Sequence, residues 1–281
     1  MKKIAILADS GCQLPIGTLE NQGIYIVPLT ITMNNKAYLD FKEISALDVF
    51  ERMNETGEII KTSQPSTGVI QAAVKRIMDN GYDHIIAISI ATGLSSTLSG
   101  MKLACDMAQM PVTLIDTKGT ANNHRYLIKV AKKLIDDQKD VTEIENVLTS
   151  LIEQSATLIM TPNLTHLKKG GRITPAVAIL GGMMKIKPIL QIQGEKLDTF
   201  SKSRTLSKAT KIMIEAIQKD IEERLDPIEK GKNVHICIAY TYDQQPALEL
   251  KEELQQLYPN SNIICDPLSL SVSCHIGPHA L

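Results

Sequence analysis

The stretch HIIAISIATGLSST (residues 84–97) joins an apolar run to a loop that is rich in hydroxyl side chains. An apolar run of this length, bounded by turn residues, is typical of a buried strand. Residues 98–108 then have a helical pattern, and residues 111–119 form another apolar run that ends in Asp-Thr. Strand, loop, helix and strand in this order are typical of a βαβ unit, so the stretch indicates an α/β fold with a mostly parallel sheet.

The rest of the first half extends this pattern. Residues 2–10 are predicted to be a strand that ends in Asp-Ser, and residues 23–40 a β-hairpin that turns at Asn34-Asn35. Helices are predicted in four further segments, namely 45–57 with Ser45 as its cap, the segment after TSQPST within 59–81, 122–136 and 142–154. Ligands of parallel sheets bind beyond the carboxyl ends of the strands, which is where the 91–97 loop is expected.

The second half has a different pattern, so we predict a domain boundary near residue 155. A strand at 156–162 precedes a short helix that ends at Gly170-Gly171, and residues 187–204 are predicted to form a hairpin with a turn near Gly194. The remaining segments are predicted to be a long helix at 206–224, a strand at 233–243, a helix at 246–258 and a strand at 262–268. The sequence therefore predicts two α/β domains, 1–155 with a mostly parallel sheet and 156–281 with a mixed or antiparallel sheet.

Composition excludes several classes of protein. With 281 residues, 43% of them hydrophobic, the chain can bury a sizeable core. Its five cysteines are scattered without the spacing of a metal site, which favours free thiols, a reducing compartment and hence the cytoplasm. We expect no signal peptide, no metal, no cofactor and no membrane span, although a transient contact with a membrane surface stays open.

The charge of the chain is unevenly distributed. A net charge of −1 argues against a generic nucleic-acid-binding protein. Residues 168–211, however, contain ten Lys/Arg and two Asp/Glu, a local charge of +8 that leaves −9 for the rest. This basic segment is either a docking face for a negatively charged partner or a solvated lysine-rich surface.

Familiar catalytic and nucleotide-binding motifs are absent. Neither GxGxxG after the first strand nor GxxxxGK[ST] occurs. GLSST has Gly93 two residues before Ser95 but Thr97 where a serine hydrolase motif would have its second glycine. A Ser-dependent hydrolase or acyltransferase that uses Ser95 and His275 therefore stays open as an alternative.

Two pairs of hydroxyls, Thr62 with Ser63 and Ser95 with Ser96, point to a binding site for an anion. Hydroxyls near a helix start can accept hydrogen bonds from its free N–H groups, and they can also donate to an anion placed there. Capping alone accounts well for Ser66 or Thr67 and less well for Thr62 and Ser95. A carboxylate or phosphate could thus be held by neutral donors, without a lysine or arginine.

Seven short motifs in this order resemble one protein family. They are ADS (8–10), KTSQPS (61–66), LSST (94–97), LIDT (114–117), HLKKGGRIT (166–174), IKPIL (186–190) followed by Gly194 and KSRT (202–205), and the terminal HIGPHAL (275–281). Over essentially its whole length the chain is similar to the DegV family, the lipid-binding proteins that serve as fatty-acid-carrying subunits of bacterial fatty acid kinases. The resemblance implies a ligand tunnel between two α/β domains.

The resemblance also implies what this chain does. It would bind a long-chain fatty acid such as palmitate, without being an enzyme itself, and present the carboxylate to a separate ATP-binding kinase subunit that forms an acyl phosphate.

The family's functional residues map onto single positions here. Its carboxylate-binding threonine and serine correspond to Thr62 and Ser95, with Ser63 and Ser96 beside them, and the terminal histidine corresponds to His275. Its docking arginines correspond to Arg172 and Arg204, and Thr97 matches the threonine of the serine loop.

The sequence departs from the family pattern at two positions. Ser96 and His279 replace glycines, and the second replacement leaves the terminal turn in question, because a glycine there can serve a positive φ.

Overall fold

A computed structural model describes residues 2–162, 164–180, 186–192, 196–229 and 231–281. The chain divides into two compact units. Unit 1 contains residues 1–49, 60–153 and 269–272, and unit 2 contains residues 50–59, 154–268 and 273–281. These units differ from the predicted domains chiefly in segments 50–59 and 269–272, each of which packs with the other half of the sequence.

Unit 1 is built on a parallel sheet with the strand order β2-β1-β6-β7. Its strands are β1 (Ile4–Asp9), β2 (Ile24–Val27), β6 (His84–Ser89) and β7 (Val112–Asp116). All three pairings are parallel, which confirms the βαβ prediction. Strand β2 lies on one side of β1, and β6 lies on the other. The direction in which strands are added to the sheet therefore reverses between β1 and β6. Ligands of α/β sheets usually bind at such a switch point.

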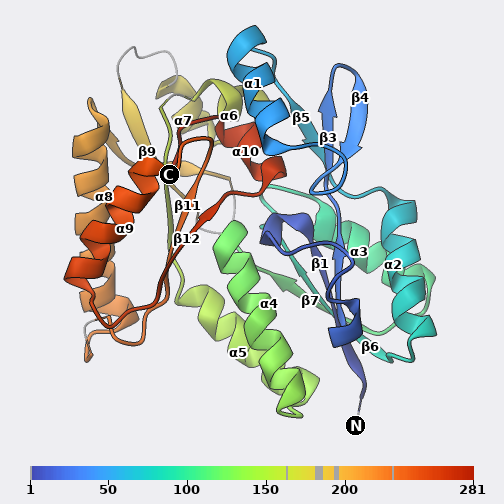
Figure 1. The fold of residues 1–281 in the computed structure, drawn as a ribbon. Coiled ribbons are helices and arrows are strands. Elements are labelled where there is room, and N and C mark those ends of the chain that lie inside the picture. The colour runs from blue at the N-terminus through green and yellow to red at the C-terminus, as the bar shows by residue number, and fades with distance from the viewer. Residues whose placement is uncertain (1, 163, 181–185, 193–195, 230) are drawn as a thin grey trace. The chain divides into compact units, whose positions relative to one another are not determined.

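Helices cover both faces of this sheet, as Figure 1 shows. They are α2 (Thr67–Asp79) and α3 (Thr97–Met107) on one face, and α4 (Ala121–Asp136) and α5 (Val141–Glu153) on the other. Alternate residues of β1 enter the two cores: Ile6 packs in the core with α4 and α5, whereas Leu7 packs in the core with α2 and α3. Burial on both faces explains the unbroken apolar runs Ile4–Ala8 of β1 and Ile85–Ile88 of β6.

A second, antiparallel sheet of unit 1 has the order β4-β3-β5. Its strands are β3 (Thr30–Met33), β4 (Lys36–Leu39) and β5 (Lys61–Ser63). The predicted hairpin turn at Asn34-Asn35 is confirmed, with φ of 52° and 58°, values that asparagine tolerates better than most residues. Helix α1 (Ala46–Thr56) follows, and Ser45 Oγ accepts a hydrogen bond from Asp48 N at 3.2 Å, as expected of its cap.

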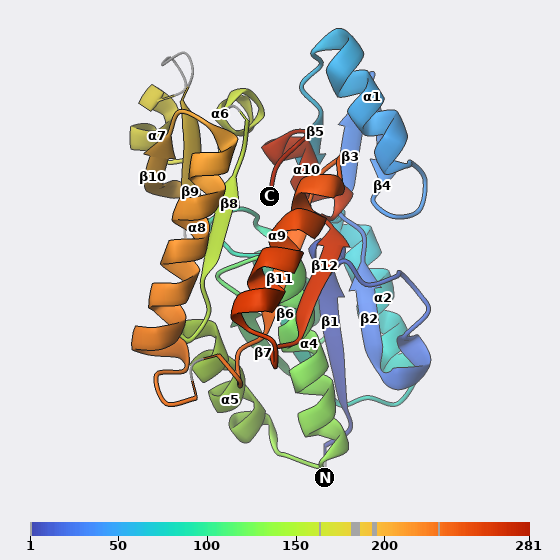
Figure 2. The same ribbon diagram turned by 60° about the vertical axis from the view of Figure 1, so that its left-hand side comes forward.

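Unit 2 contains a three-stranded antiparallel sheet and a parallel strand pair. The sheet has the order β10-β9-β8, from β8 (Thr157–Met160), β9 (Lys187–Ile192) and β10 (Asp198–Ser203), and the pair is β11 (Ile236–Tyr240) with β12 (Ile263–Pro267). Helix α8 (Leu206–Asp220) packs along the sheet, and α9 (Gln245–Leu257) packs on the strand pair (Figure 2). The mixed or antiparallel architecture predicted for the second half is thus confirmed.

Several segments of unit 2 add to or qualify the sequence prediction. Helix α6 (Thr165–Gly170) was expected, whereas α7 (Pro175–Leu180) and α10 (Leu270–Ile276), which runs from unit 1 into unit 2, were not. The last turn of the predicted 206–224 helix is a π-helical turn at Ile221–Leu225. The turn predicted near Gly194 lies outside the described residues.

Within the described ranges, every helix falls short of the length and apolar character that a membrane crossing requires.

Candidate functional site

The loop after β6 places Ser95 at the beginning of helix α3. The Thr97 N–H donates a hydrogen bond to Ser95 Oγ at 3.3 Å, and Thr97 Oγ1 lies 2.8 Å from the same oxygen. The Ser95 side chain therefore accepts the N–H of the first residue of α3, although Ser96 and not Ser95 occupies the cap position. Ser96, the other predicted hydroxyl of this loop, is exposed, and its φ of −87° shows that this position does not need a glycine.

Three consecutive backbone amides hold the base of this loop. The N–H groups of Ile90, Ala91 and Thr92 donate to Asp9 Oδ2 at 3.0 Å, to the Gly119 carbonyl at 2.8 Å and to Asp116 Oδ1 at 3.2 Å. Asp9 ends β1 and Asp116 ends β7, so the acceptors come from the two strands that flank β6. The loop is thus fixed from both sides at the switch point of the sheet.

Each of the two aspartates binds more than one donor. Asp116 Oδ2 accepts a hydrogen bond from Thr92 Oγ1 at 2.5 Å, and Asp116 Oδ1 also accepts the Lys118 N–H at 3.0 Å. Asp9 Oδ1 accepts the Gly11 N–H at 2.9 Å. Each carboxylate thereby ties the loop to its own strand.

Asp9 is also paired with a buried histidine. His124 Nδ1 lies 4.0 Å from Asp9 Oδ1, and His124 Nε2 donates to the Ile88 carbonyl at 2.9 Å. Both side chains are fully buried. Burial raises the pKa of the Asp9 carboxyl and lowers that of the His124 imidazole, because each group loses the hydration of its charged form.

The second predicted hydroxyl pair lies on strand β5. The sequence predicted a loop here, but Thr62 pairs with Ile31 and Ser63 with Thr30 of β3. Thr62 is half-buried and Ser63 is exposed. Ser66 Oγ then accepts the Val69 N–H at 3.4 Å, so the prediction that Ser66 caps the next helix is confirmed.

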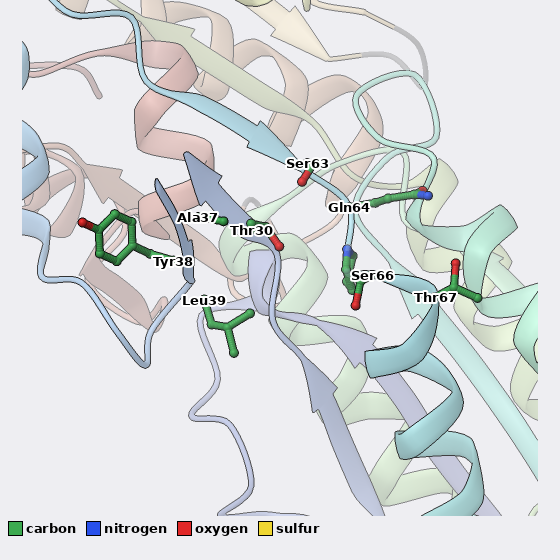
Figure 3. Close-up of a pocket in the computed structure, with 9 residues that line it drawn as sticks. Thr30, Ala37, Tyr38, Leu39, Ser63, Gln64, Ser66 and Thr67 are labelled. Atoms are coloured by element: carbon green, nitrogen blue, oxygen red, sulfur yellow. The ribbon is translucent and has the colours of Figure 1, made fainter. Parts of the chain in front are cut away.

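An open pocket of about 600 Å³ lies beside this hydroxyl pair and was not foreseen. Figure 3 shows Ser63 next to Thr30, with Ser66 and Thr67 at the beginning of α2. The other five residues of its wall are Ala37, Tyr38, Leu39, Gln64 and Pro65. The wall of the pocket combines hydroxyls with apolar side chains.

The two hydroxyl segments are neighbours within unit 1. Gln64, directly after Ser63, lies against the first turns of α3: a Cβ added to Gly100 would be 3.7 Å from Gln64 Oε1 and 3.2 Å from Ile70 Cδ1. The structure therefore places Gln64 of the TSQPS segment beside helix α3, which follows Ser95 in the chain.

Unit 2 brings the GGR motif and the terminal histidine together. A Cβ on Gly170 would collide with His275 Nδ1, so only a glycine lets the helix α6 backbone approach the imidazole ring this closely. Arg172 donates to the Gly170 carbonyl. Burial, followed by the positive charge of Arg172 and the nearby His166, lowers the pKa of His275 to about 4.

The terminal motif is held by hydrogen bonds around Thr241. Thr241 Oγ1 donates to the Gly277 carbonyl at 2.7 Å, and the His279 N–H donates to the Thr241 carbonyl at 3.1 Å. His279 has a φ of 61°, which explains why a glycine suits this position. Its ring packs edge-on against Tyr242 with 5.0 Å between centroids, a contact that offsets part of the backbone strain.

The basic segment is largely solvent-exposed. Arg204 is exposed directly after β10, whereas Arg172 is half-buried. The Arg172 carbonyl accepts the Leu197 N–H, one residue before β10 begins, so the two arginines mark opposite ends of this strand, roughly 20 Å apart at about 3.3 Å per residue. Among the described residues of the segment, the other exposed basic side chains are Lys168, Lys169, Lys196, Lys202, Lys208 and Lys211.

Some contributors to the site were not predicted. Asp9 and Asp116 were visible as acidic residues at strand ends, but no role was assigned to them. His166 packs against Gly277, where a Cβ would lie 2.6 Å from His166 Cδ2, and its spacing in the sequence gives no signal of this contact. The described residues contain no group of three His, Cys, Asp or Glu side chains that could hold a metal ion.

Comparisons with known proteins agree with this architecture. A family model for the uncharacterised DegV family matches residues 3–281. Protein DegV of Bacillus subtilis is 26% identical over 282 residues, which cover 99% of this chain and 97% of that protein.

Solved structures of DegV proteins also superpose over nearly the whole chain. The B. subtilis structure, described as a fatty acid binding protein, has a TM-score of 0.87 at 25% identity and covers 100% of this chain and 97% of its own. The fatty acid binding DegV family protein of Streptococcus agalactiae has a TM-score of 0.89 at 24% identity, with the same coverage. The DegV family protein of Thermus thermophilus, whose structure is described in terms of fatty acid binding, has a TM-score of 0.88 at 24% identity, again with the same coverage. The family match over almost every residue, together with the shared motifs and fold, means that this chain belongs to the DegV family.

Proposed function

We propose that this protein binds a long-chain fatty acid in a buried apolar tunnel and presents its carboxylate to a separate ATP-binding kinase subunit, which forms an acyl phosphate. The carboxylate contacts are assigned to Thr62, Ser63, Ser95, Ser96 and His275. The descriptions of the B. subtilis, S. agalactiae and T. thermophilus relatives as fatty acid binding support the choice of ligand.

The observation that carries the proposal is the hydrogen bonding of Ser95. A hydroxyl oxygen has two lone pairs and one hydrogen to donate. When the Thr97 N–H and the Thr97 O–H both donate to Ser95 Oγ, the lone pairs are used and the Ser95 hydrogen is left for an outside acceptor. A carboxylate only accepts hydrogen bonds, so its binding favours the arrangement in which Thr97 donates to Ser95 and Ser95 donates to the carboxylate.

Tail and head group contribute differently to binding. A palmitoyl tail of about fourteen methylenes, at ~0.8 kcal/mol for each one buried, contributes on the order of 10 kcal/mol before ordering costs. A hydroxyl-to-carboxylate hydrogen bond contributes only about 1.5–3 kcal/mol. The tail therefore sets the affinity and the head group sets the position of the carboxylate.

Neutral hydroxyls suit a protein that hands its ligand on. An arginine clamp would lower the nucleophilicity of the carboxylate oxygen and would hold an acyl phosphate product tightly. Under this proposal that oxygen attacks the γ-phosphoryl group of ATP on the partner subunit, and the basic segment with Arg172 and Arg204 docks the partner.

Mass spectrometry of organic extracts from the purified protein tests the binding step. We expect a long-chain fatty acid in near-stoichiometric amount. Protein that yields no acid, and that takes up none when incubated with palmitate, would contradict the proposal.

The variants Thr62→Ala and Ser95→Ala test the division between tail and head group. We expect palmitate binding to weaken by roughly tenfold, the equivalent of one charged hydrogen bond, and phosphorylation by a cognate kinase to fall further. Palmitate affinity by calorimetry and acyl phosphate formation are measured on the same preparations. Equal losses in both measurements would argue against a presenting role for these hydroxyls.

Two observations disfavour the alternative of a serine hydrolase or acyltransferase. Ser95 is not among the residues with positive φ, whereas a nucleophile elbow holds its serine in a strained turn. A histidine with a pKa of about 4 is also a weak base at neutral pH. A fluorophosphonate probe would label a hydrolase at Ser95, and we expect no labelling.

A further inference from the structure

We propose that Asp9 and Asp116 are positioning residues. From the ends of β1 and β7 they hold backbone amides at the base of the 90–97 loop. They thereby fix Ser95 so that it selects a carboxylate over an uncharged head group. This inference rests on the proposed function, because it concerns how Ser95 meets a fatty acid.

The first step is the direct hold on the loop. Asp9 Oδ2 binds the Ile90 N–H, and Asp116 binds both the N–H and the hydroxyl of Thr92. Between them, the Ala91 N–H is bound by the Gly119 carbonyl. Three successive residues are thus held by two segments of the chain, the end of β1 and the end of β7 with the turn after it, which restricts the backbone of this part of the loop.

The second step passes this order to Ser95. The Ala91 carbonyl accepts the Ser95 N–H at 3.1 Å and the Leu94 N–H at 2.9 Å, so the turn that carries Ser95 is built directly on the clamped residue. Ser95 Oγ then meets Thr97, whose side chain is fully buried. A shift of Ala91 would therefore move the Ser95 backbone relative to the buried Thr97, its hydrogen-bond partner.

The third step concerns charge. A bare carboxylate near a fatty acid head group would repel it, but here every carboxylate oxygen of the two aspartates accepts an N–H or O–H group. Amide and hydroxyl dipoles offset the negative charge locally, so the clamp can stand close to an anionic ligand.

The two aspartates differ in how they tolerate replacement by asparagine. At position 116, the amide oxygen can accept the Thr92 and Lys118 N–H groups, while the amide NH₂ can donate to Thr92 Oγ1. At position 9, both oxygens face N–H donors, those of Gly11 and Ile90, so an amide NH₂ must oppose one of them. Asp116→Asn should therefore preserve the clamp, whereas Asp116→Ala and Asp9→Asn should break it.

The experiment compares two ligands with the same tail, palmitate and 1-hexadecanol, by displacement of a fluorescent fatty acid probe. The ratio of their dissociation constants reports on the head group alone. We expect the wild type and Asp116→Asn to prefer palmitate by about tenfold or more, and Asp116→Ala and Asp9→Asn to lose most of that preference, as Ser95→Ala does.

Asp226→Ala is the matched control for stability. Asp226 also accepts backbone N–H groups, those of Glu229, Gly231 and Asn233, but in unit 2. The Asp226→Ala substitution should lower the melting temperature, while the ratio of the two dissociation constants stays at the wild-type value. If Asp9→Asn fails to fold, the comparison of Asp116→Ala with Asp116→Asn tests the inference by itself.

A measurement without ligand separates this inference from the proposed function. In NMR spectra of the ligand-free protein, the Ser95 and Thr97 amide resonances should shift or broaden in Asp116→Ala and stay at wild-type positions in Asp116→Asn and Asp226→Ala. Unchanged resonances and an unchanged ligand ratio in Asp116→Ala would overturn the inference. A wild type that binds neither ligand would overturn the proposed function, and the NMR comparison would still judge the clamp.

Discussion

At the scale of single residues, His275 makes the stability of the protein depend on pH. Its pKa is lowered from 6.5 to about 4, first by burial and then by Arg172 and His166. Below pH 6.5 the unfolded chain binds a proton that the native protein does not, so stability is present above 6.5 and is lost as pH falls toward 4. At about 1.4 kcal/mol per pKa unit, the loss reaches roughly 3 kcal/mol.

The variant His275→Gln tests this dependence. We expect its free energy of unfolding to fall less between pH 7.5 and 4.5 than that of the wild type, by about 2–3 kcal/mol. Urea unfolding followed by circular dichroism at both pH values gives the comparison. An identical fall in both proteins would show that His275 is protonated as readily in the native state as in the unfolded chain. His166, His124 and His84 also have lowered pKa values, so some decline is expected to persist in the variant.

Single residues also show what the sequence could reveal. Ser45 and Ser66 were predicted as caps because capping depends on a side chain and the N–H groups two or three positions later, which are local. The contact of Gly170 with His275 joins positions 105 apart, and the one between Asp9 and Ile90 joins positions 81 apart. Such contacts depend on the whole fold, and a single sequence does not display them.

At the scale of helices, α2 and α3 begin with a serine but use it differently. Ser66 Oγ accepts the Val69 N–H at the beginning of α2, whereas Ser96 at the equivalent position of α3 makes no side-chain cap bond. The neighbouring Ser95 accepts the N–H of Thr97, the first residue of α3. We expect Ser66→Ala to lower the free energy of unfolding by about 1 kcal/mol. Ser96→Ala, the matched control, should change it by less than about 0.5 kcal/mol.

Thermal and urea unfolding of the two variants measure this difference. Equal destabilisation would mean that Ser96 contributes to α3 through a contact other than capping. The comparison also bears on the binding site, because Ser96 is an assigned carboxylate contact: a variant that keeps its stability reports cleanly on ligand affinity.

The elements that the sequence failed to predict are short. Strand β5 has three residues, and its hydroxyls were interpreted as a loop before a helix. Helices α7 and α10 have six and seven residues, too few for a helical repeat to stand out. Strands and helices buried in the two cores of the parallel sheet, by contrast, carried strong apolar patterns and were predicted.

At the scale of the whole molecule, the proposed docking of a partner uses two arginines that lie apart in unit 2. Arg172 and Arg204 lie at opposite ends of β10, so a partner must span that strand to meet both. We expect Arg172→Ala and Arg204→Ala to keep bound fatty acid while each reduces phosphorylation by a cognate kinase by roughly tenfold, the scale of one charged contact. Lys129→Ala, an exposed lysine of α4 in unit 1, is the control.

Lipid content by mass spectrometry and acyl phosphate formation are measured for the three variants. Loss of bound fatty acid in Arg172→Ala would place this arginine in the ligand site, in keeping with its position beside His275. Phosphorylation that falls equally in Lys129→Ala would point to a diffuse effect of charge instead of docking at β10.

Each unit has a core of its own, which affects how the molecule unfolds. Ile86 lies in the centre of the parallel sheet, and Leu254 lies between α9 and the β11–β12 pair. Ile86→Ala and Leu254→Ala should each cost about 2–5 kcal/mol. Calorimetry should show whether the two substitutions lower the melting temperature of one common unfolding transition or of two separate transitions. A destabilisation below ~1 kcal/mol in either variant would contradict the burial of that side chain.

The triple hold on residues 90, 91 and 92 has a consequence for deuterium uptake. Loop amides normally exchange with solvent within seconds, because no carbonyl or carboxylate retains their hydrogens. Here the Ile90 and Ala91 amides are buried and hydrogen-bonded, so their labelling should be much slower than that of an ordinary loop, whereas Thr92 is exposed and should exchange sooner. Peptide-level mass spectrometry should then reveal a short protected segment directly after β6.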